Sequence, residues 1–254
     1  MKFYLGTDRA NWLWNGQLTD IPLFVSHRTL RRYKNLKPAT TRWSLDSGGF
    51  TELTLHGTWT IKPSEYITAI RRYQNEIGML DWASPQDWMC EPHMLERTGK
   101  DIHMHQWLTV NNYLELKWQA PELPIIPVLQ GWTLDDYLRH VEMYDNMNID
   151  LTAEPVVGVG SICRRQATWE AAEIAQALQP IRLHAFGAKR DAIGLYGELL
   201  TSCDSMAWSY SGRYSPDPTC PKRTCNHCLH YALEWRRKAL EPNRPTLWGT
   251  TNAH

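Results

Sequence analysis

Four side chains that can carry chemistry follow short apolar runs of the sequence: Asp46, Asp87, Gln130 and Asp204. Retaining glycosyl transfer uses a pair of carboxylates, of which one attacks the anomeric carbon and the other acts as general acid and base. A third carboxylate and an amide supply the acceptors and donors that a purine edge requires. Taken alone, an aspartate after a strand is as often the N-cap of the next helix as it is a functional residue. The coincidence of several such polar groups is what favours a site.

Three cysteines close together in the sequence form a second candidate site. The pattern Cys220-x4-Cys225-x2-Cys228-x-His230 contains the Cys-x2-Cys spacing that is typical of zinc sites. His230 is the first choice for the fourth ligand, and His254 is the second. Four protein ligands leave no open coordination position, so this zinc is expected to be structural. The alternative interpretation is a cluster of free thiols.

These side chains need a framework, and short apolar runs do alternate with amphipathic segments. The expected strands are Phe3–Gly6, Leu23–Ser26, Trp43–Ser47, Gly78–Trp82, Ile125–Leu129, Val156–Val159, Arg182–Phe186 and Cys203–Trp208. The expected helices are Ser64–Ile77, Thr133–Met147, Thr168–Leu178, Asp191–Leu200 and His230–Leu240. This alternation predicts an α/β fold, a (β/α)8 TIM barrel with a small C-terminal zinc-binding element. An open doubly wound sheet fits the same alternation, but the sequence contains no GxGxxG or P-loop motif.

In a barrel the functional groups lie at the carboxyl ends of the strands. The third expected strand runs into Asp46-Ser47-Gly48-Gly49-Phe50, and the fourth leads towards Asp87. The fifth, sixth and eighth end in Gln130-Gly131, Gly158-Val159-Gly160-Ser161 and Cys203-Asp204-Ser205. We therefore expect the three aspartates, the glutamine and several glycines to converge at one mouth.

Composition sets the limits of the remaining expectations. All 254 residues are expected to form one domain, 1–254, with the zinc-binding segment at about 215–240. The 27 Lys plus Arg balance the 27 Asp plus Glu, which removes the simplest argument for a nucleic-acid partner, a strongly basic chain. No apolar stretch approaches the roughly 18 residues of a membrane span. The N-terminus has no signal-peptide pattern, so a cytoplasmic protein with reduced cysteines is expected.

A local basic run leaves room for a polyanionic partner. Residues 27–37, HRTLRRYKNLK, follow the second expected strand on the side of the mouth. A charge run is usually a solvated face, and the alternative is phosphate contact, which predicts strongly salt-dependent binding. Most of the 13 tryptophans are expected in the core, and exposed ones would suit stacking on unpaired bases.

Several segments resemble the tRNA-guanine transglycosylases. Asp46-Ser47-Gly48-Gly49-Phe50 is similar to their DSGGF/Y motif, and Leu129-Gln130-Gly131 to their VQG element. Residues 158–161 stand where the family has a glycine-rich loop. His184-Ala185-Phe186-Gly187 resembles an HxMG strand, and residues 203–213 resemble an FDCVxPTRxxR segment. The resemblance covers most of 43–228, and the chain departs from it where the family has DEC and this chain has Asp87-Trp88-Met89-Cys90.

The resemblance implies a zinc-bearing barrel that exchanges guanine in a polynucleotide for a 7-deazaguanine base. By position, Asp204 resembles the nucleophile and Asp46 the general acid/base. The expected base-binding residues are Asp87, Gln130, Gly131, Gly158, Gly160, Ser47 and Gly48. Asp81 is the alternative to Asp87. No redox or nucleotide cofactor is implied.

In its short length, the chain resembles the DNA-directed branch of this superfamily, which is known from bacteriophages and bacterial DNA-modification clusters. The incoming base of that branch is a 7-deazaguanine such as preQ0. The resemblance thus implies DNA as partner, in the cytoplasm of a bacterium or an infected host, and leaves open a homodimer. Three alternatives remain: the same exchange on tRNA, a retaining glycoside hydrolase, and a non-catalytic barrel that only binds nucleic acid.

Overall fold

The computed structural model describes residues 1–162, 168–221 and 223–241, and its centre is one sheet of parallel strands. The eight strands are β1 Lys2–Thr7, β2 Leu23–Ser26, β3 Trp43–Asp46, β4 Leu80–Ala83, β5 Val128–Leu129, β6 Val157–Val159, β7 Leu183–Ala185 and β8 Ser202–Ser205. Each overlaps one of the strands expected from the sequence.

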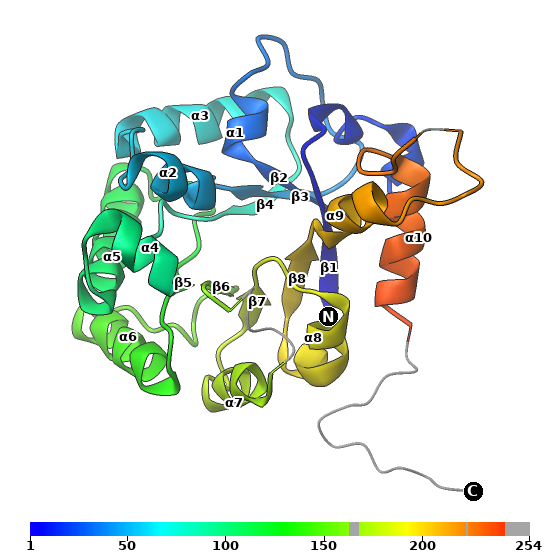
Figure 1. The fold of residues 1–254 in the computed structure, drawn as a ribbon. Coiled ribbons are helices and arrows are strands. Elements are labelled where there is room, and N and C mark those ends of the chain that lie inside the picture. The colour runs from blue at the N-terminus through cyan, green and yellow to red at the C-terminus, as the bar shows by residue number, and fades with distance from the viewer. Residues whose placement is uncertain (163–167, 222, 242–254) are drawn as a thin grey trace, which may run out of the picture.

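The strand order β4-β3-β2-β1-β8-β7-β6-β5 places the last strand beside the first. The sheet curls, and the helices lie around its outside (Figure 1). An isolated parallel bridge joins Ala83, at the end of edge strand β4, to Ile125, which precedes edge strand β5. The backbone N–H of Ala83 donates to Pro124 O at 2.9 Å. The fold is therefore α/β with an eight-stranded, parallel, curled half-barrel sheet.

The helices follow the strands along the chain. They are α1 His27–Leu30, α2 Gly49–His56, α3 Pro63–Glu76, α4 Pro92–Thr98, α5 Ile102–Gln119, α6 Leu134–Asn146, α7 Trp169–Ala177, α8 Arg190–Tyr196, α9 Ala207–Tyr214 and α10 Leu229–Ala239, with 3-10 turns at Ala10–Trp12, Gly16–Leu18 and Gly197–Leu199. All five expected helices are present. None of the helices among the described residues is both long enough and apolar enough to cross a membrane.

Helix α5 is not among the expected helices because half of its buried face is polar. His105, Gln106 and Thr109 are buried there beside Val110 and Tyr113. A hydrophobic stripe with 3.6-residue spacing is therefore absent, although Asp101 caps the helix by accepting from Met104 N at 2.8 Å. The polar residues of this face contact the site described below.

Most strand boundaries differ from those expected by one to three residues, and two of the differences have a visible backbone cause. The last strand ends at Ser205, not Trp208, because the backbone leaves the extended region at Met206 and α9 begins there. Trp208 is buried on α9 and its Nε1 donates to Gly6 O at 2.8 Å. The fourth strand begins at Leu80, not Gly78, because Gly78 and Met79 adopt positive φ values of 70° and 55°.

The strands divide their side chains between two cores, with the period of two that a pleated strand imposes. Leu5, Val25 and Leu45 belong to the large core between sheet and helices. Tyr4 and Phe24, which neighbour Leu5 and Val25 along β1 and β2, belong to a second cluster inside the curl. It also contains Trp82, Ile126 and Val156, with Phe186 packed against it. The ring of His184 joins it, with its centroid 4.6 Å from that of Trp82. An aromatic layer thus fills the interior beneath the carboxyl ends of the strands.

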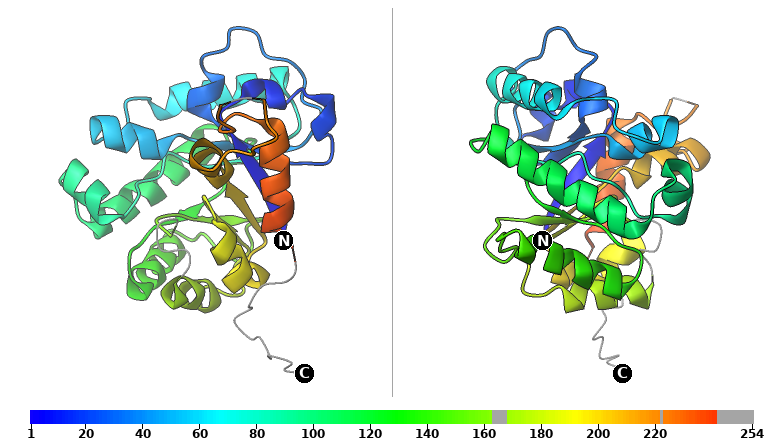
Figure 2. Two further views of the ribbon diagram at one scale, coloured as in Figure 1. Left: turned by 45° about the vertical axis from the view of Figure 1, so that its right-hand side comes forward. Right: turned by 90° about the vertical axis from the view of Figure 1, so that its left-hand side faces the viewer.

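The C-terminal helices cover the outside of the sheet at β1. Helix α10 lies beside β1 in the views of Figures 1 and 2, and its Trp235 ring centroid is 6.4 Å from that of Phe3. The segment that joins α9 to α10 carries the three clustered cysteines. The candidate metal site is therefore attached to the strand pair β1–β8, next to the strand that holds Asp204.

Candidate active site and metal centre

A cavity of about 440 Å³ opens above the aromatic layer, at the carboxyl ends of the strands. It is lined by side chains or backbone from every strand or the loop that follows it, including Gly6, Ser26, Asp46, Ser84, Asp87, Gln130, Gly160, Phe186 and Asp204. Phe24 and Phe186, from the aromatic cluster, form part of its wall. The cavity therefore combines aromatic surface for a flat ligand with polar groups that can orient it.

Asp46 and Asp204 bring two carboxyl groups to this cavity from β3 and β8. Burial raises the pKa of Asp46, and the nearby charge of Asp204 raises it further. Hydrogen bonds from the Gly48 backbone and the Ser26 side chain oppose that rise in the pKa. A carboxyl group whose pKa is raised holds its proton more readily, which is the property required of a general acid.

Asp204 is held in place through one of its oxygens. Its Oδ1 accepts from Gly187 N at 2.9 Å, and Nε2 of His184 lies 3.4 Å from the same atom. Nδ1 of His184 is 2.9 Å from Ser202 Oγ. Burial lowers the pKa of His184, although Asp204 opposes this, and the lowered pKa favours the neutral ring. Among the described residues, these two contacts hold the carboxylate in position.

Asp87 and Gln130 form a hydrogen-bonded pair on the cavity wall. Nε2 of Gln130 donates to Oδ2 of Asp87 at 2.5 Å. Burial is the main reason that the pKa of Asp87 rises to about 7, and the charges of Asp46 and Glu91 add to it. The hydrogen bond from Gln130 opposes that rise. A carboxyl and an amide side by side present both acceptors and donors to a ligand edge.

The backbone and side chain of Gln130 are fixed from several directions. Nε2 of Gln106, on α5, donates to Gln130 O at 2.7 Å, and Gln130 N donates to Nδ1 of His140 at 2.8 Å. Gly160 packs directly against the amide, since a Cβ added there would lie 2.1 Å from Gln130 Nε2. The hydroxyl of Tyr137 donates to Gly160 O at 2.7 Å. The amide is therefore confined between its neighbours.

The structure places five of the nine residues expected for catalysis and base binding on the cavity: Asp46, Asp87, Gln130, Gly160 and Asp204. The other four lie beside it. Ser47 is buried, and its N–H donates to Ser84 Oγ at 2.9 Å. Gly48 has a φ of 90° and begins α2, Gly131 packs on Asp136, and a Cβ on Gly158 would lie 2.5 Å from the ring of Phe186. These glycines make room for neighbouring side chains.

Asp81, the alternative to Asp87, lies at the opposite end of the sheet. Its carboxylate forms ion pairs with Lys2, at the start of β1, and with Arg42, which precedes β3. Its position among the amino ends of the strands separates it from the cavity.

Several cavity residues are not among those expected from the sequence, above all Ser161 and Glu91. Ser161 Oγ donates to Gln130 Oε1 at 2.6 Å and accepts from Cys90 N at 2.6 Å. Glu91 is buried, and its Oε2 lies 3.0 Å from the same hydroxyl. The period of two along the strands is the signal that identifies Phe24 and Phe186, since each is two residues from another inward-facing position.

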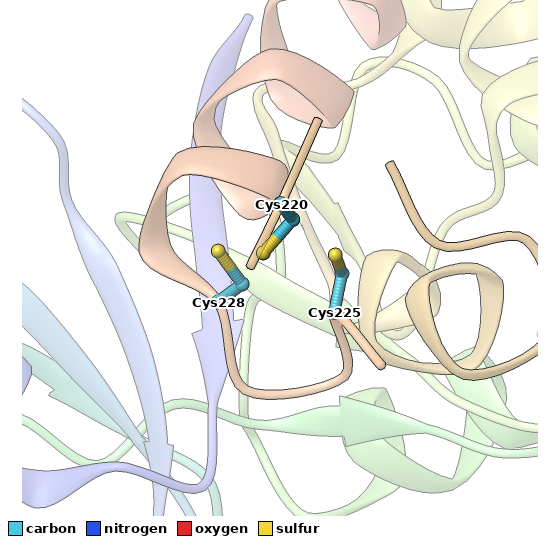
Figure 3. A group of neighbouring side chains, drawn as sticks. All are labelled: Cys220, Cys225 and Cys228. Carbon is cyan, nitrogen blue, oxygen red and sulfur yellow. The ribbon is translucent and has the colours of Figure 1, made fainter. Parts of the chain in front are cut away.

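The three cysteines point towards one another from the segment between α9 and α10 (Figure 3). The sulfurs of Cys220, Cys225 and Cys228 all lie within 4.8 Å of one another. A close approach of α9 supports this segment, because Cys225 N donates to Gly212 O at 2.7 Å and a Cβ on Gly212 would be 2.6 Å from Cys225 O. Three convergent thiols fit a soft divalent metal such as zinc.

The expected fourth ligand does not join this cluster. The side chain of His230 is 75% exposed, and its Nδ1 lies 4.0 Å from Asp217 Oδ2. Among the described residues the cluster contains only the three cysteines. The second choice, His254, lies outside the described residues.

The basic run is divided by the fold. His27 is buried against Tyr73, with Nδ1 2.9 Å from the Tyr73 hydroxyl, and Arg28 forms an ion pair with the buried Glu52. The exposed basic residues of the run are Arg31, Arg32, Lys34 and Lys37. Only this exposed part is available to a partner.

The family model described as DpdA, DeoxyPurine in DNA protein A, matches residues 1–249. The matched region includes every cavity residue named above and the three clustered cysteines. No curated protein was found to match the sequence.

Proposed function

Because the chain belongs to the family of DeoxyPurine in DNA protein A, we propose that it exchanges guanine in DNA for a 7-deazaguanine base such as preQ0. The observation that carries the proposal is the convergence of Asp46, Asp204 and the Asp87–Gln130 pair on one cavity with aromatic walls. The chemistry it supports is a retaining double displacement.

In the first step Asp204 is the nucleophile. Its carboxylate attacks C1′ of the target deoxyguanosine, a bond from the Asp204 oxygen to C1′ forms, and the bond from C1′ to the base breaks. Asp46 donates a proton to the departing guanine, which its raised pKa favours. Because Gly187 and His184 contact Oδ1, we assign the attack to Oδ2.

In the second step the incoming base reverses this sequence. Asp46, now ionised, removes the proton from the nitrogen of the 7-deazaguanine, and that nitrogen attacks C1′. The bond between C1′ and Asp204 breaks, so the carboxylate is regenerated and the sugar keeps its configuration. One base is released for each base inserted, and no redox change takes place.

Asp87 and Gln130 are proposed to read the base edge. An ionised carboxylate accepts from N1–H and the 2-amino group of guanine, and the amide Nε2 of Gln130 donates to O6. A 7-deazaguanine keeps the N1–H, the 2-amino group and O6, so one pocket can bind both the leaving and the entering base. Phe24 and Phe186 provide aromatic surface beside that pair.

The experiment is a search for the covalent adduct. The protein is incubated with a guanine-containing DNA oligomer, and separately with tRNA, and resolved under denaturing conditions. We expect a DNA adduct that disappears in Asp204→Asn and persists in Asp20→Asn, an exposed aspartate away from the cavity. Exchange of radiolabelled guanine into the same nucleic acids is measured in parallel.

The outcomes separate the candidate functions. An adduct and exchange with tRNA alone would keep the chemistry and replace the polymer. DNA binding without exchange, unchanged in Asp204→Asn, would favour a non-catalytic binding protein. Hydrolysis of oligosaccharides would favour a glycoside hydrolase.

Two structural details complete the proposal. We propose that the curled sheet closes as a (β/α)8 barrel, which the bridge between Ala83 and Ile125 supports. We also propose that Cys220, Cys225 and Cys228 hold a structural zinc ion, whose role is to fix the segment between α9 and α10.

A further inference from the structure

The hydroxyl of Ser161 lies at the centre of the hydrogen bonds that surround Gln130. It is 2.6 Å from Gln130 Oε1, 2.6 Å from the backbone N of Cys90 and 3.0 Å from Oε2 of Glu91. Ser161 is itself 4% exposed. Nothing in the exchange chemistry proposed above uses this residue, although it lines the same cavity.

The order of donors in this group sets the direction of the Gln130 amide. The backbone N–H of Cys90 can only donate, so Ser161 Oγ accepts from it. The single hydroxyl proton of Ser161 is then available for the closer acceptor, which is Oε1 of Gln130. The opposite end of the amide, Nε2, consequently faces Asp87, which accepts from it when ionised. When Asp87 is ionised and Ser161 donates to Oε1, every donor in this group therefore faces an acceptor.

The backbone of Ser161 indicates that the side chain has a role. Its φ of 56° lies in the left-handed region, where glycine is the favoured residue and a serine is held at a conformational cost. A residue kept in such a conformation at a cavity wall points to a function for its side chain. The only groups it contacts through Oγ in the described chain belong to Cys90, Glu91 and Gln130.

We propose that Ser161 is a specificity-determining positioning residue, which holds the Gln130 amide with its N–H₂ group towards the base and thereby selects purines with an oxygen at C6. This inference rests on the proposed function, because it takes Gln130 as a contact of the base. A reversed amide would present Oε1 and would accept from a purine with an amino group at C6. Without the hydroxyl, reversal becomes possible whenever Asp87 is protonated, and its pKa of about 7 makes that form common at neutral pH.

Two variants test the inference, and they differ in the backbone. Both variants remove the hydroxyl. Ser161→Ala keeps a Cβ, so the backbone strain of the positive φ remains, whereas Ser161→Gly relieves that strain. The probes are free guanine and 2,6-diaminopurine, which differ in the group at C6 and in the proton on N1; only the C6 group faces the Gln130 amide in this proposal, so the change in their ratio between wild type and variant reports on that amide. Calorimetry on the full chain gives the ratio of their dissociation constants, together with the thermal midpoint of each variant.

We expect the preference for guanine over 2,6-diaminopurine to fall at least about tenfold in both variants. Ser161→Gly should have a higher thermal midpoint than Ser161→Ala, because glycine suits the positive φ, yet both variants should lose selectivity, which an effect of stability alone would not produce. In a Gln130→Ala background, Ser161→Gly should have no further effect on the ratio, because the residue acts through that amide.

The outcomes for the two proposals are distinct. If the wild type exchanges guanine in DNA but both Ser161 variants keep its selectivity, the role of Ser161 is overturned and the proposed function stands. If the wild type neither binds guanine nor exchanges it, the proposed function fails first. Equal losses of affinity for both bases would also overturn the inference, since they would indicate a general disturbance of the pocket.

Discussion

Gly160 shows how a single missing side chain can shape a recognition site. Substitution Gly160→Ala would place a Cβ 2.1 Å from Gln130 Nε2, so the amide cannot keep its position beside Asp87. Overpacking of this kind costs about 1–3 kcal/mol. We expect guanine affinity, measured by calorimetry, to fall about 10- to 100-fold. Gly16→Ala is the matched control, because a Cβ there meets no atom within 4 Å. Unchanged affinity in Gly160→Ala would contradict the contact.

The ionisation of Asp87 makes base binding depend on pH. The carboxylate form accepts hydrogen bonds from the base, and burial raises its pKa to about 7. Guanine affinity should therefore increase as the pH rises from about 5.5 towards 8 and level off above the pKa. In Asp87→Asn this increase should disappear, because the amide does not titrate. A wild-type affinity that is independent of pH over this range would argue against Asp87 as the acceptor.

The residues of the cavity differ in how far sequence can predict them. Asp46, Gln130, Gly160 and Asp204 are predictable at the mouth because each lies at or just after the end of a strand, which is a local property of the chain. The role of Ser161 is not, because its partner Cys90 is 71 residues away and the contact exists only in the folded chain. Gly131 and Gly158 are expected at the ligand, but a glycine serves close packing of protein groups equally well.

At the scale of elements, the pairing of α9 and α10 depends on the cysteine segment between them. We expect the purified protein to contain one zinc ion per chain and Cys225→Ser to lose it, with a lower thermal midpoint. A chelator should lower the midpoint of the wild type in the same way. The metal content follows from elemental analysis.

His230→Ala separates the two interpretations of the fourth ligand. With 75% of its side chain exposed, His230 is not positioned as a ligand, so this variant should keep its zinc. Cys203→Ala is the control for cysteine replacement, because Cys203 is buried on β8 outside the cluster. A loss of zinc in His230→Ala would restore the ligand set expected from the sequence.

The elements themselves are predictable where one period dominates. The eight strands and five of the helices follow from apolar spacing and from caps such as Thr133, whose Oγ1 accepts from Asp136 N. Helix α5 escapes this reasoning because it turns His105, Gln106 and Thr109 inwards, where they bind the backbone near the site. Polar residues that support a site therefore obscure the pattern by which a helix is recognised.

At the scale of the whole molecule, zero net charge must be reconciled with a polyanionic substrate. Arg31, Arg32, Lys34 and Lys37 are exposed together after α1. We expect DNA affinity to fall steeply between low and moderate salt. Glutamine at these four positions should reduce the slope by about 0.9 for each phosphate of duplex DNA that the variant no longer neutralises.

The matched control for this charge replacement is Arg71→Gln. Arg71 is on α3, and its guanidinium already forms an ion pair with Glu122. Replacing it should therefore leave the salt dependence of DNA affinity unchanged. Titrations by fluorescence anisotropy at several salt concentrations supply the slopes. A slope that is the same for the wild type and the fourfold variant would exclude this segment from the DNA-binding surface.

The position of β8 beside β1 has a consequence for synthesis of the chain on the ribosome. Asp204 is carried by the final strand, which pairs with the first in register from Lys2–Ser202 to Leu5–Ser205. A nascent chain that stops before residue 202 lacks Asp204, the proposed nucleophile, and also leaves one side of β1 without its neighbour. On the proposed mechanism, a truncated translation product could not break a glycosidic bond in DNA, and this capacity arises only when the first and the last strand of the chain have both been made.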